Sequence, residues 1–163
     1  MKLTRPLLTS SFAALRATPV VSFPVPKEYQ RIHQDLYQFL TIARDIADVE
    51  TTHRSYTMTQ GVFRVFRRRL VDVKDAILFS NSLPAGIRAL FVAEWDLSEA
   101  RQPFTTREEM TKEVQSLRPS HNFAPDSAIA DVALALRRTV EDPDRLDKIL
   151  DEISPEAKAF WKA

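Results

Sequence analysis

Glu50 and His53 are separated by a spacing that metal sites on helices use. In di-iron four-helix proteins, a Glu-x-x-His motif supplies two ligands from one helix face, and neighbouring helices supply further glutamates. Here the motif falls in residues 48–56, a polar stretch without helical periodicity that predicts a loop. His33 and His121 likewise have no partner at ligand spacing. We therefore predict no catalytic, cofactor-binding or metal-binding residue in this sequence.

Five arginines between residues 54 and 69, with no acidic residue among them, form the main charge feature: Arg54, Arg64, Arg67, Arg68 and Arg69. Helical periodicity predicts that Arg64, Arg67 and Arg68 point outward, where they could contact phosphates. The same stretch offers few Asn or Gln side chains to read bases and no aromatic platform for stacking. The alternative is a solvated face or an internal network of ion pairs, for which the acidic segment 141–156 could supply carboxylates.

Arg69 differs from its neighbours because its helical angle places it between Met58 and Val65 on the apolar face. A buried guanidinium that lacks a partner is strongly destabilising. We therefore predict that Arg69 makes a structural contact that links helices, unless its side chain extends past the end of the helix to water.

Leu134 is apolar on a helix face that periodicity predicts to be wet, and it lies close to Arg137 and Arg138. One exposed leucine usually has no meaning by itself. Together with the basic residues, however, it could form a docking spot for a protein partner. The candidate interaction surface therefore consists of Arg64, Arg67, Arg68, Leu134, Arg137 and Arg138.

Helices are predicted to position these side chains. Apolar residues recur at helical spacing over residues 27–47, 58–71, 73–81 and 105–117, and again over 128–140 and 146–153. Short helices are predicted around residues 87–91 and after Ser154. Asp72 and Asp142 are suitable N-cap residues, and a capping box is available either to Thr105 with Glu108 or to Thr106 with Glu109.

Residues 58–91 recur seventy residues later, at 128–161, without a gap. Val62 aligns with Val132, for example, and Ala89 with Ala159. We predict two similar units of three to four helices, residues 28–95 and 105–163, joined by a connecting stretch at 96–104. One unit of such short helices would bury too little surface, so both units are predicted to share one core.

The composition favours an all-α fold. Two glycines and ten prolines in 163 residues leave few tight hairpins and no glycine-rich phosphate loop, whereas prolines mark breaks between helices. The absence of cysteine excludes disulfides and thiolate chemistry. A net charge of +1 argues against a generally basic nucleic-acid coat protein. No apolar run approaches the roughly 18 residues that a membrane-spanning helix needs.

Residues 1–27 stand apart because they are cationic, rich in hydroxyl side chains and free of acidic residues. Such a segment is typical either of a flexible tail or of a leader that directs a protein to an organelle. The absence of cysteine fits a reducing compartment. We predict a cytoplasmic protein, while the leader keeps targeting open.

Three motifs stand out along the chain: Leu83-Pro84 followed by Ile87, Leu90-Phe91 and Trp95-Asp96, then Pro103-Phe104-Thr105 with Glu108-Glu109, Met110 and Val114, and finally Ile153, Ala159 and Phe160-Trp161. Together they resemble the bacterial family called domain of unknown function 2267. The last motif is looser, because Ile153-Ser154 stands where the family usually has Leu-Pro.

The resemblance covers roughly residues 29–161 and implies an all-helical duplicated bundle of prokaryotic origin. Trp95 and Trp161 belong to its packing motifs and are expected to have structural roles. The resemblance implies no activity and carries no catalytic residue over. A bacterial origin would exclude a mitochondrial leader, so that residues 1–27 would be a tail or a docking segment.

We predict a non-enzymatic helical protein that binds a protein partner or itself. The alternative is binding of nucleic acid or an anionic surface through the arginine-rich helix 58–71, and a metal-carboxylate enzyme is a more distant third class. Arg64 and Arg69 align with Leu134 and Thr139 in the second copy. We therefore expect function to lie where the two copies differ.

Overall fold

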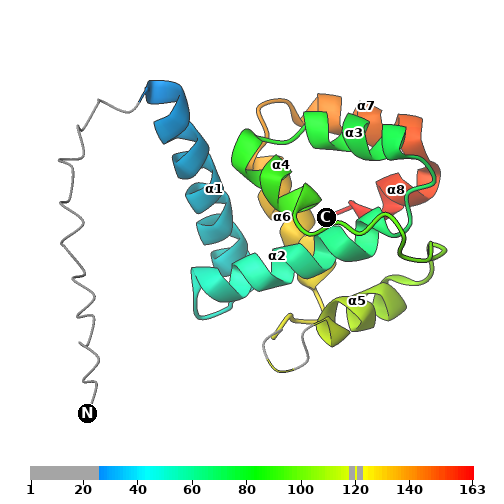
Figure 1. The fold of residues 1–163 in the computed structure, drawn as a ribbon. Coiled ribbons are helices and arrows are strands. Elements are labelled where there is room, and N and C mark those ends of the chain that lie inside the picture. Colours follow the sequence, from blue (N-terminus) through cyan, green and yellow to red (C-terminus); the bar gives the residue numbers. More distant parts are fainter. Residues whose placement is uncertain (1–25, 118–119, 121–122) are drawn as a thin grey trace, which may run out of the picture.

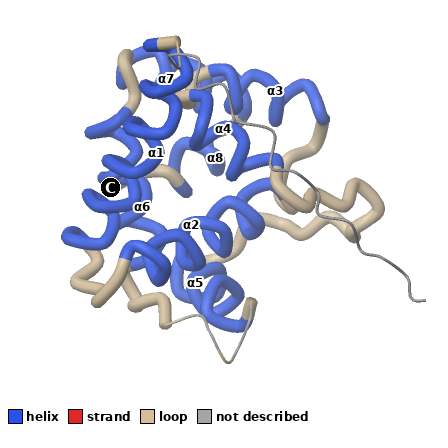
Figure 2. The backbone as a smooth tube through the Cα atoms, turned by 60° about the vertical axis from the view of Figure 1, so that its left-hand side comes forward, coloured by secondary structure: helices blue, strands red, loops and turns tan. Residues whose placement is uncertain are grey.

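The computed structural model describes residues 26–117, 120 and 123–163, and this part of the chain is all-helical without a strand, as predicted (Figures 1 and 2). Its helices are α1 (Lys27–Ile46), α2 (Thr52–Arg67), α3 (Val73–Asn81), α4 (Ala85–Val92), α5 (Arg107–Ser116), α6 (Ala128–Thr139), α7 (Pro143–Ile153) and α8 (Pro155–Phe160). The predicted tail or leader lies outside the described residues up to residue 25, and so does His121.

Side-chain caps define where most helices begin. Asp72 accepts a hydrogen bond from the Lys74 amide at the start of α3, and Asp142 accepts one from the Arg145 amide at the start of α7. Of the two capping boxes that the sequence offers, the one formed by Thr106 and Glu109 is present. These caps satisfy amide groups that have no partner within the helix. This is why Asp and Thr residues before an apolar stretch predicted these helix starts well.

The predicted loop at residues 48–56 is wrong for its second half, because α2 begins at Thr52. Hydroxyl side chains in and after this turn are buried and donate to backbone carbonyls. The Oγ atom of Ser55 is 2.7 Å from the carbonyl oxygen of Leu40, and Oγ1 of Thr59 is 2.7 Å from that of Ser55. Polar residues therefore form a buried helical face here, which a search for apolar periodicity does not detect.

One hydrophobic core joins the two halves of the chain. Trp161 near the C-terminus is 1% exposed, and its ring packs among aromatic residues of the first half. The centroid of the Trp161 ring lies 5.2 Å from the ring centroid of Phe79, 5.3 Å from that of Phe66 and 5.9 Å from that of Phe63. These ring contacts cross between the halves, so both halves contribute to the same core.

The helices of the two halves pack reciprocally. α1 lies chiefly against α6, α5 lies against α2, and α3 lies beside α7 (Figures 1 and 2). Moreover, α3 and α7 begin at residues 73 and 143, and α4 and α8 begin at residues 85 and 155, which is the offset of 70 seen in the sequence. This order and packing are what two related units would produce, while the duplication itself stays a prediction.

The helices that begin the two halves differ in length, with 20 residues in α1 and 10 in α5. The additional part of α1 crosses the start of α4 at Gly86. A Cβ atom at this position would lie 2.9 Å from Cβ of Leu36 and 3.0 Å from the carbonyl oxygen of Ile32. The close approach of α1 and α4 therefore requires a glycine at position 86.

Arginines, rather than glycines, close several helix C-termini. Arg88 donates to the carbonyls of Ser80 and Leu83 at the end of α3. Arg107 donates to three carbonyls at the end of α8, those of Ala159, Phe160 and Lys162. A guanidinium satisfies the free carbonyls of the last turn and interacts favourably with the helix dipole. The two non-glycine residues with φ of 50° in the described chain, Asp48 and Glu94, follow α1 and α4.

Candidate functional site

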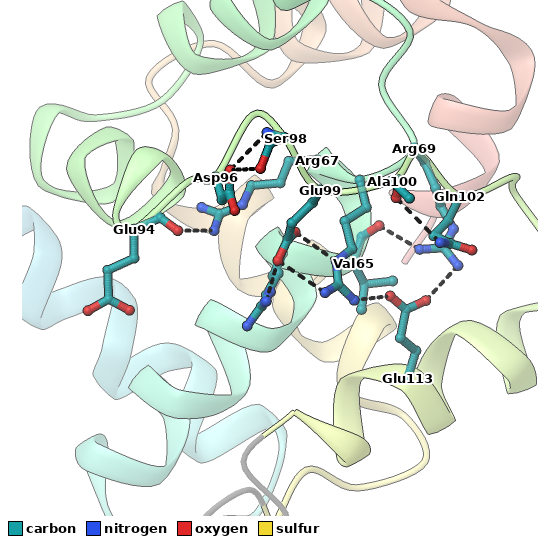
Figure 3. A network of polar contacts seen from close by, with 12 residues as sticks. Val65, Arg67, Arg69, Glu94, Asp96, Ser98, Glu99, Ala100, Gln102 and Glu113 are labelled. Carbon is teal, nitrogen blue, oxygen red and sulfur yellow. Dashed lines mark hydrogen bonds and ion pairs between the residues drawn. The ribbon is translucent and has the colours of Figure 1, made fainter.

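The arginines at the end of α2 face two carboxylates from other segments (Figure 3). Glu99, in the connector between α4 and α5 (residues 93–106), forms ion pairs with both Arg64 and Arg68. Arg68 also pairs with Glu113 of α5, with 2.9 Å between Nη1 and Oε1. The acidic segment 141–156, which the sequence offered as a source of carboxylates, does not supply the partners of these arginines.

Arg69 is buried just after the end of α2, with 5% of its surface exposed. Its Nη2 atom lies 2.7 Å from Oε2 of Glu113, and its Nη1 atom donates to the carbonyl of Val65 at 2.7 Å. Arg69 thus joins the end of α2 to α5 and does not extend to water.

The prediction that Arg67 points outward is wrong, because the side chain is 6% exposed. Its guanidinium donates to the carbonyls of Phe91, Ala93 and Glu94, where α4 ends, and lies 5.4 Å from the ring centroid of Trp95. Removal from water lowers the pKa of Arg67. Periodicity along α2 could not reveal this role, because the acceptors belong to another helix.

The electrostatics of this network favour its charged form. Hydrogen bonds from Arg68 and then Arg64 hold the pKa of Glu99 at about 2, against an ordinary value of 4.5. The same contact with Glu99 raises the pKa of Arg68. Glu99 therefore stays ionised at neutral pH and is not poised to exchange a proton.

The other half of the predicted surface lies on α6. Leu134 is half-buried, Arg138 is exposed, and Arg137 forms an ion pair with Asp147 of α7 at 2.8 Å. Within the described chain, no hydrogen bond or ion pair joins these residues to Arg64, Arg67 or Arg68. The six residues predicted as one interaction surface thus make their polar contacts in two separate groups.

Glu50 and His53 do not form a metal site. Glu50 precedes α2 and forms an ion pair with Arg54 at 3.1 Å, while His53 lies in the first turn of the helix. No group of three or more His, Asp or Glu side chains in the described ranges has the geometry to hold a metal ion. Likewise, no helix among the described residues is both long and apolar enough to cross a membrane.

Two cavities of similar volume, about 400 Å³ and about 350 Å³, occupy equivalent places in the two halves. The first lies between α1, the α3–α4 turn and the α6–α7 turn, and the second lies between the connector, the α7–α8 turn and the α2–α3 turn. The first is lined by charges of both signs, including Arg31, Asp35 and Arg145. The second is more apolar, with Leu70, Phe104 and Ile153. The hydroxyls of Ser82 and Thr139, which line the first, donate to the backbone carbonyls of Phe79 and Ala135.

The outward side of α1 carries an unusual exposed surface, which we call the α1 outer face. It consists of Tyr29, Gln30, His33, Gln34, Tyr37 and Gln38, all of which are exposed. An aromatic residue followed by glutamine thus recurs every four residues, so the side chains form two parallel rows along the helix. Tyr29 and Tyr37 are 63% and 58% exposed. The face contains no Asp, Glu, Lys or Arg.

The opposite side of α1 anchors the helix. Phe39, Leu40 and Ala43 are buried in the core, and Leu36 packs against it. The apolar periodicity of residues 27–47 predicted the helix but did not identify the outer face. The signal in the sequence was an aromatic residue followed by glutamine at intervals of four, with no charged residue at these six positions.

The comparisons with known proteins identify a family and no activity. The family model described as "Uncharacterized conserved protein (DUF2267)" matches residues 36–160. The match begins within α1, so most of the α1 outer face precedes it. The comparison with curated proteins finds no match. Together with the all-helical fold and the motifs around Trp95 and Trp161, the match shows that this chain belongs to the DUF2267 family.

Proposed function

We propose that the protein is a non-enzymatic interaction module that binds another protein, or a second copy of itself, through the α1 outer face. The observation that carries this proposal is the absence of charge from that face, in a chain whose residues are 28% charged. An exposed helix face normally carries charged side chains. Protein interfaces, in contrast, are depleted of charge at their centre and enriched in tyrosine.

The side chains of this face are suited to a partner. Tyr29 and Tyr37 present large apolar ring surfaces whose hydroxyl groups still need hydrogen bonds, and tyrosine contributes strongly to interfaces for this reason. The glutamine amides both donate and accept hydrogen bonds. The absence of cysteine fits a reducing compartment, and we place this function in the cytoplasm.

The experiment compares baits in an extract of the native cells treated with nuclease. The wild-type protein and a Leu97→Lys variant, which alters an exposed apolar residue of the connector, should retain the same bound proteins, including untagged copies of the chain. A Tyr29→Lys/Tyr37→Lys variant should lose them, because lysine is disfavoured at the centre of an interface. Retention of every bound protein by that variant would refute the proposal.

Leu134, Arg137 and Arg138 form a smaller second candidate surface on α6. Its support is an exposed arginine beside a half-buried leucine that lies outside the hydrophobic core. The same capture experiment with a Leu134→Lys variant tests this surface. Loss of the bound proteins from this variant alone would move the interaction from α1 to α6.

Binding of nucleic acid or an anionic surface through α2 is the alternative, and the contacts of its arginines argue against it. A phosphate could reach Arg64 or Arg68 only by competing with Glu99, and Arg67 and Arg69 are buried. The test is fluorescence anisotropy with random DNA. Strong binding that weakens steeply with added salt would favour this alternative, since phosphate contacts release counterions.

A further inference from the structure

We propose that the partner of the α1 outer face is a second copy of this chain, with the two α1 helices crossing about a two-fold axis near Gln34. This inference rests on the proposed function and names the partner. It concerns a part of α1 that largely precedes the residues matched by the family model.

The rows of the α1 outer face have the geometry of a helix–helix contact. Tyr29, His33 and Tyr37 form one ridge at intervals of four residues, and the three glutamines form the next. Ridges with this spacing interdigitate with identical ridges when two helices cross at about −50°. A two-fold axis through the middle of the rows brings the same residues together from both copies, as in an isologous dimer.

Charge complementarity favours a second copy over a charged partner. A charged side chain buried against this face would find no opposite charge on it, which is costly. When the face meets itself, its uncharged side chains oppose one another, and the two Gln34 amides at the axis can each donate and accept a hydrogen bond. The face is therefore complementary to a neutral surface, and a copy of itself meets that condition.

The position of α1 leaves the outer face accessible without a change in the fold. α1 forms the left-hand margin of the helical body, and its inner side lies against α6 and α4 (Figure 1). The close contact at Gly86 and the buried Phe39 hold the helix in place. A face that is already ordered loses less conformational entropy on binding.

The size of the face sets the expected affinity. Six residues on one helix cover less than the roughly 800 Å² per partner that stable interfaces bury. We therefore expect a weak dimer, with a dissociation constant on the order of 10 μM. Lysines introduced at position 37 of both copies would oppose like charges in the contact, and association should weaken by at least about tenfold.

The first experiment measures mass by sedimentation equilibrium over protein concentrations well below and well above that constant. The full-length wild-type chain and Leu97→Lys should form a dimer as the concentration rises. Tyr37→Lys should associate at least about tenfold more weakly and should keep the melting temperature of the monomer. A wild-type chain that is monomeric throughout, or a Tyr37→Lys dimer of undiminished affinity, would overturn the inference.

The second experiment uses the absence of cysteine from the chain. A Gln34→Cys variant carries a single thiol at the proposed axis and can be labelled with a benzophenone maleimide. Irradiation should double the mass and join position 34 to α1 of the second copy. Lys148→Cys, at an exposed position of α7, serves as the control and should give no dimer.

The outcomes separate this inference from the proposed function. Cross-links confined to residues 1–25 of the same chain would assign the face to that segment and refute the dimer. If the chain is monomeric while capture still yields other proteins that depend on Tyr29 and Tyr37, the inference fails and the proposed function stands. If neither self-association nor such capture is found, both fail.

Discussion

Two ten-residue stretches precede the equivalent parts of α1 and α5 in the two halves. They are residues 26–35, at the start of α1, and residues 97–106, at the end of the connector. Their structures differ. The first stretch continues α1 as a helix, crosses α4 at Gly86 and exposes the first four residues of the α1 outer face. The second is not helical, and its Glu99 pairs with the arginines of α2. Residues 26–35 therefore expose a surface to solvent, whereas residues 97–106 cover the arginines of α2.

Local sequence explains the difference. Pro103 has no amide hydrogen and disfavours a helical conformation at Gln102, so α5 cannot extend backward as α1 does. The Gln102 amide instead donates to the carbonyl of Arg68 at 3.0 Å, and Thr106 caps a shorter helix. Where Gly86 accommodates α1, the second half has Glu156, which lines a cavity. The same helix order and packing therefore accommodate a close helix crossing at Gly86 and an open cavity at Glu156.

The largest expected effect on the free energy of unfolding concerns the ion pair between Arg69 and Glu113 of α5. Glu113→Ala leaves Arg69 buried without a carboxylate, and the free energy of unfolding should fall by about 3 kcal/mol. Urea denaturation measures the change. Glu108→Ala, at an exposed position on the same helix, should change it by less than about 0.5 kcal/mol.

A double variant identifies the cause. When Arg69→Met is combined with Glu113→Ala, the buried charge is removed and much of the loss should be restored. Additive losses in the double variant would mean that the two side chains do not act as a pair.

The next effect tests the α1 half. Gly86→Ala should lower the free energy of unfolding by about 1–2 kcal/mol, because the new methyl group meets Leu36 and the backbone of Ile32 and displaces α1 from α4. The equivalent change in the second half, Glu156→Ala, meets no crossing helix and should stay within about 0.5 kcal/mol of the wild type. Equal effects at the two positions would remove this distinction between the halves.

A smaller effect concerns the charge of Glu99. Glu99→Gln should cost about 1 kcal/mol near neutral pH, since it removes the anion shared by Arg64 and Arg68. The pKa of Glu99 is lower in the folded protein, at about 2, than its ordinary 4.5. The carboxylate therefore contributes its full stabilisation above pH 4.5 and loses it as the pH falls toward 2.

Urea midpoints of the wild type and Glu99→Gln should therefore converge as the pH is lowered from about 7 to about 2.5. Glu108→Gln, at an exposed position of α5, provides the control and should change the urea midpoint little at any pH. A difference between wild type and Glu99→Gln that is independent of pH would exclude the charge as its source.

The smallest effect is expected on the α1 outer face. Tyr37→Lys should change the free energy of unfolding of the monomer by less than about 0.5 kcal/mol, because the side chain is 58% exposed. Calorimetry at low protein concentration measures this. A marked drop in the melting temperature of the dilute variant would show that the face supports folding rather than association.

Helix boundaries were predictable where local signals define them. The bounds of α3, 73 to 81, agree with the prediction at both ends, because Asp72 supplies a cap and the apolar spacing continues to the break before Pro84. The start of α2 was missed because its buried side chains are hydroxyls. In both cases the outcome follows from what periodicity measures, namely where apolar residues lie.

The environment of the arginines was not predictable from the same signals. The partners of Arg67 and Arg68 lie 24 to 45 residues away in the chain, on α4, the connector and α5. A net charge near zero indicated that ion pairs were available, but not which ones. The α1 outer face, in contrast, could have been found from sequence, since the charge-free rows of Tyr29 to Gln38 are visible once exposed positions are examined for missing charge.

Arg67 and Arg107 also constrain the order in which the chain folds. Arg67 is 24 to 27 residues away in the chain from the carbonyls to which it donates at the end of α4. Arg107 is 52 to 55 residues away from those to which it donates at the end of α8. The helices concerned, α4 and α8, have eight and six residues, whereas isolated helices shorter than about 12 residues are marginal in water. Their ends are completed only after distant segments meet, and closing those loops costs entropy. We expect α8 to gain protection from hydrogen exchange late in refolding, after α2 and α5 have docked.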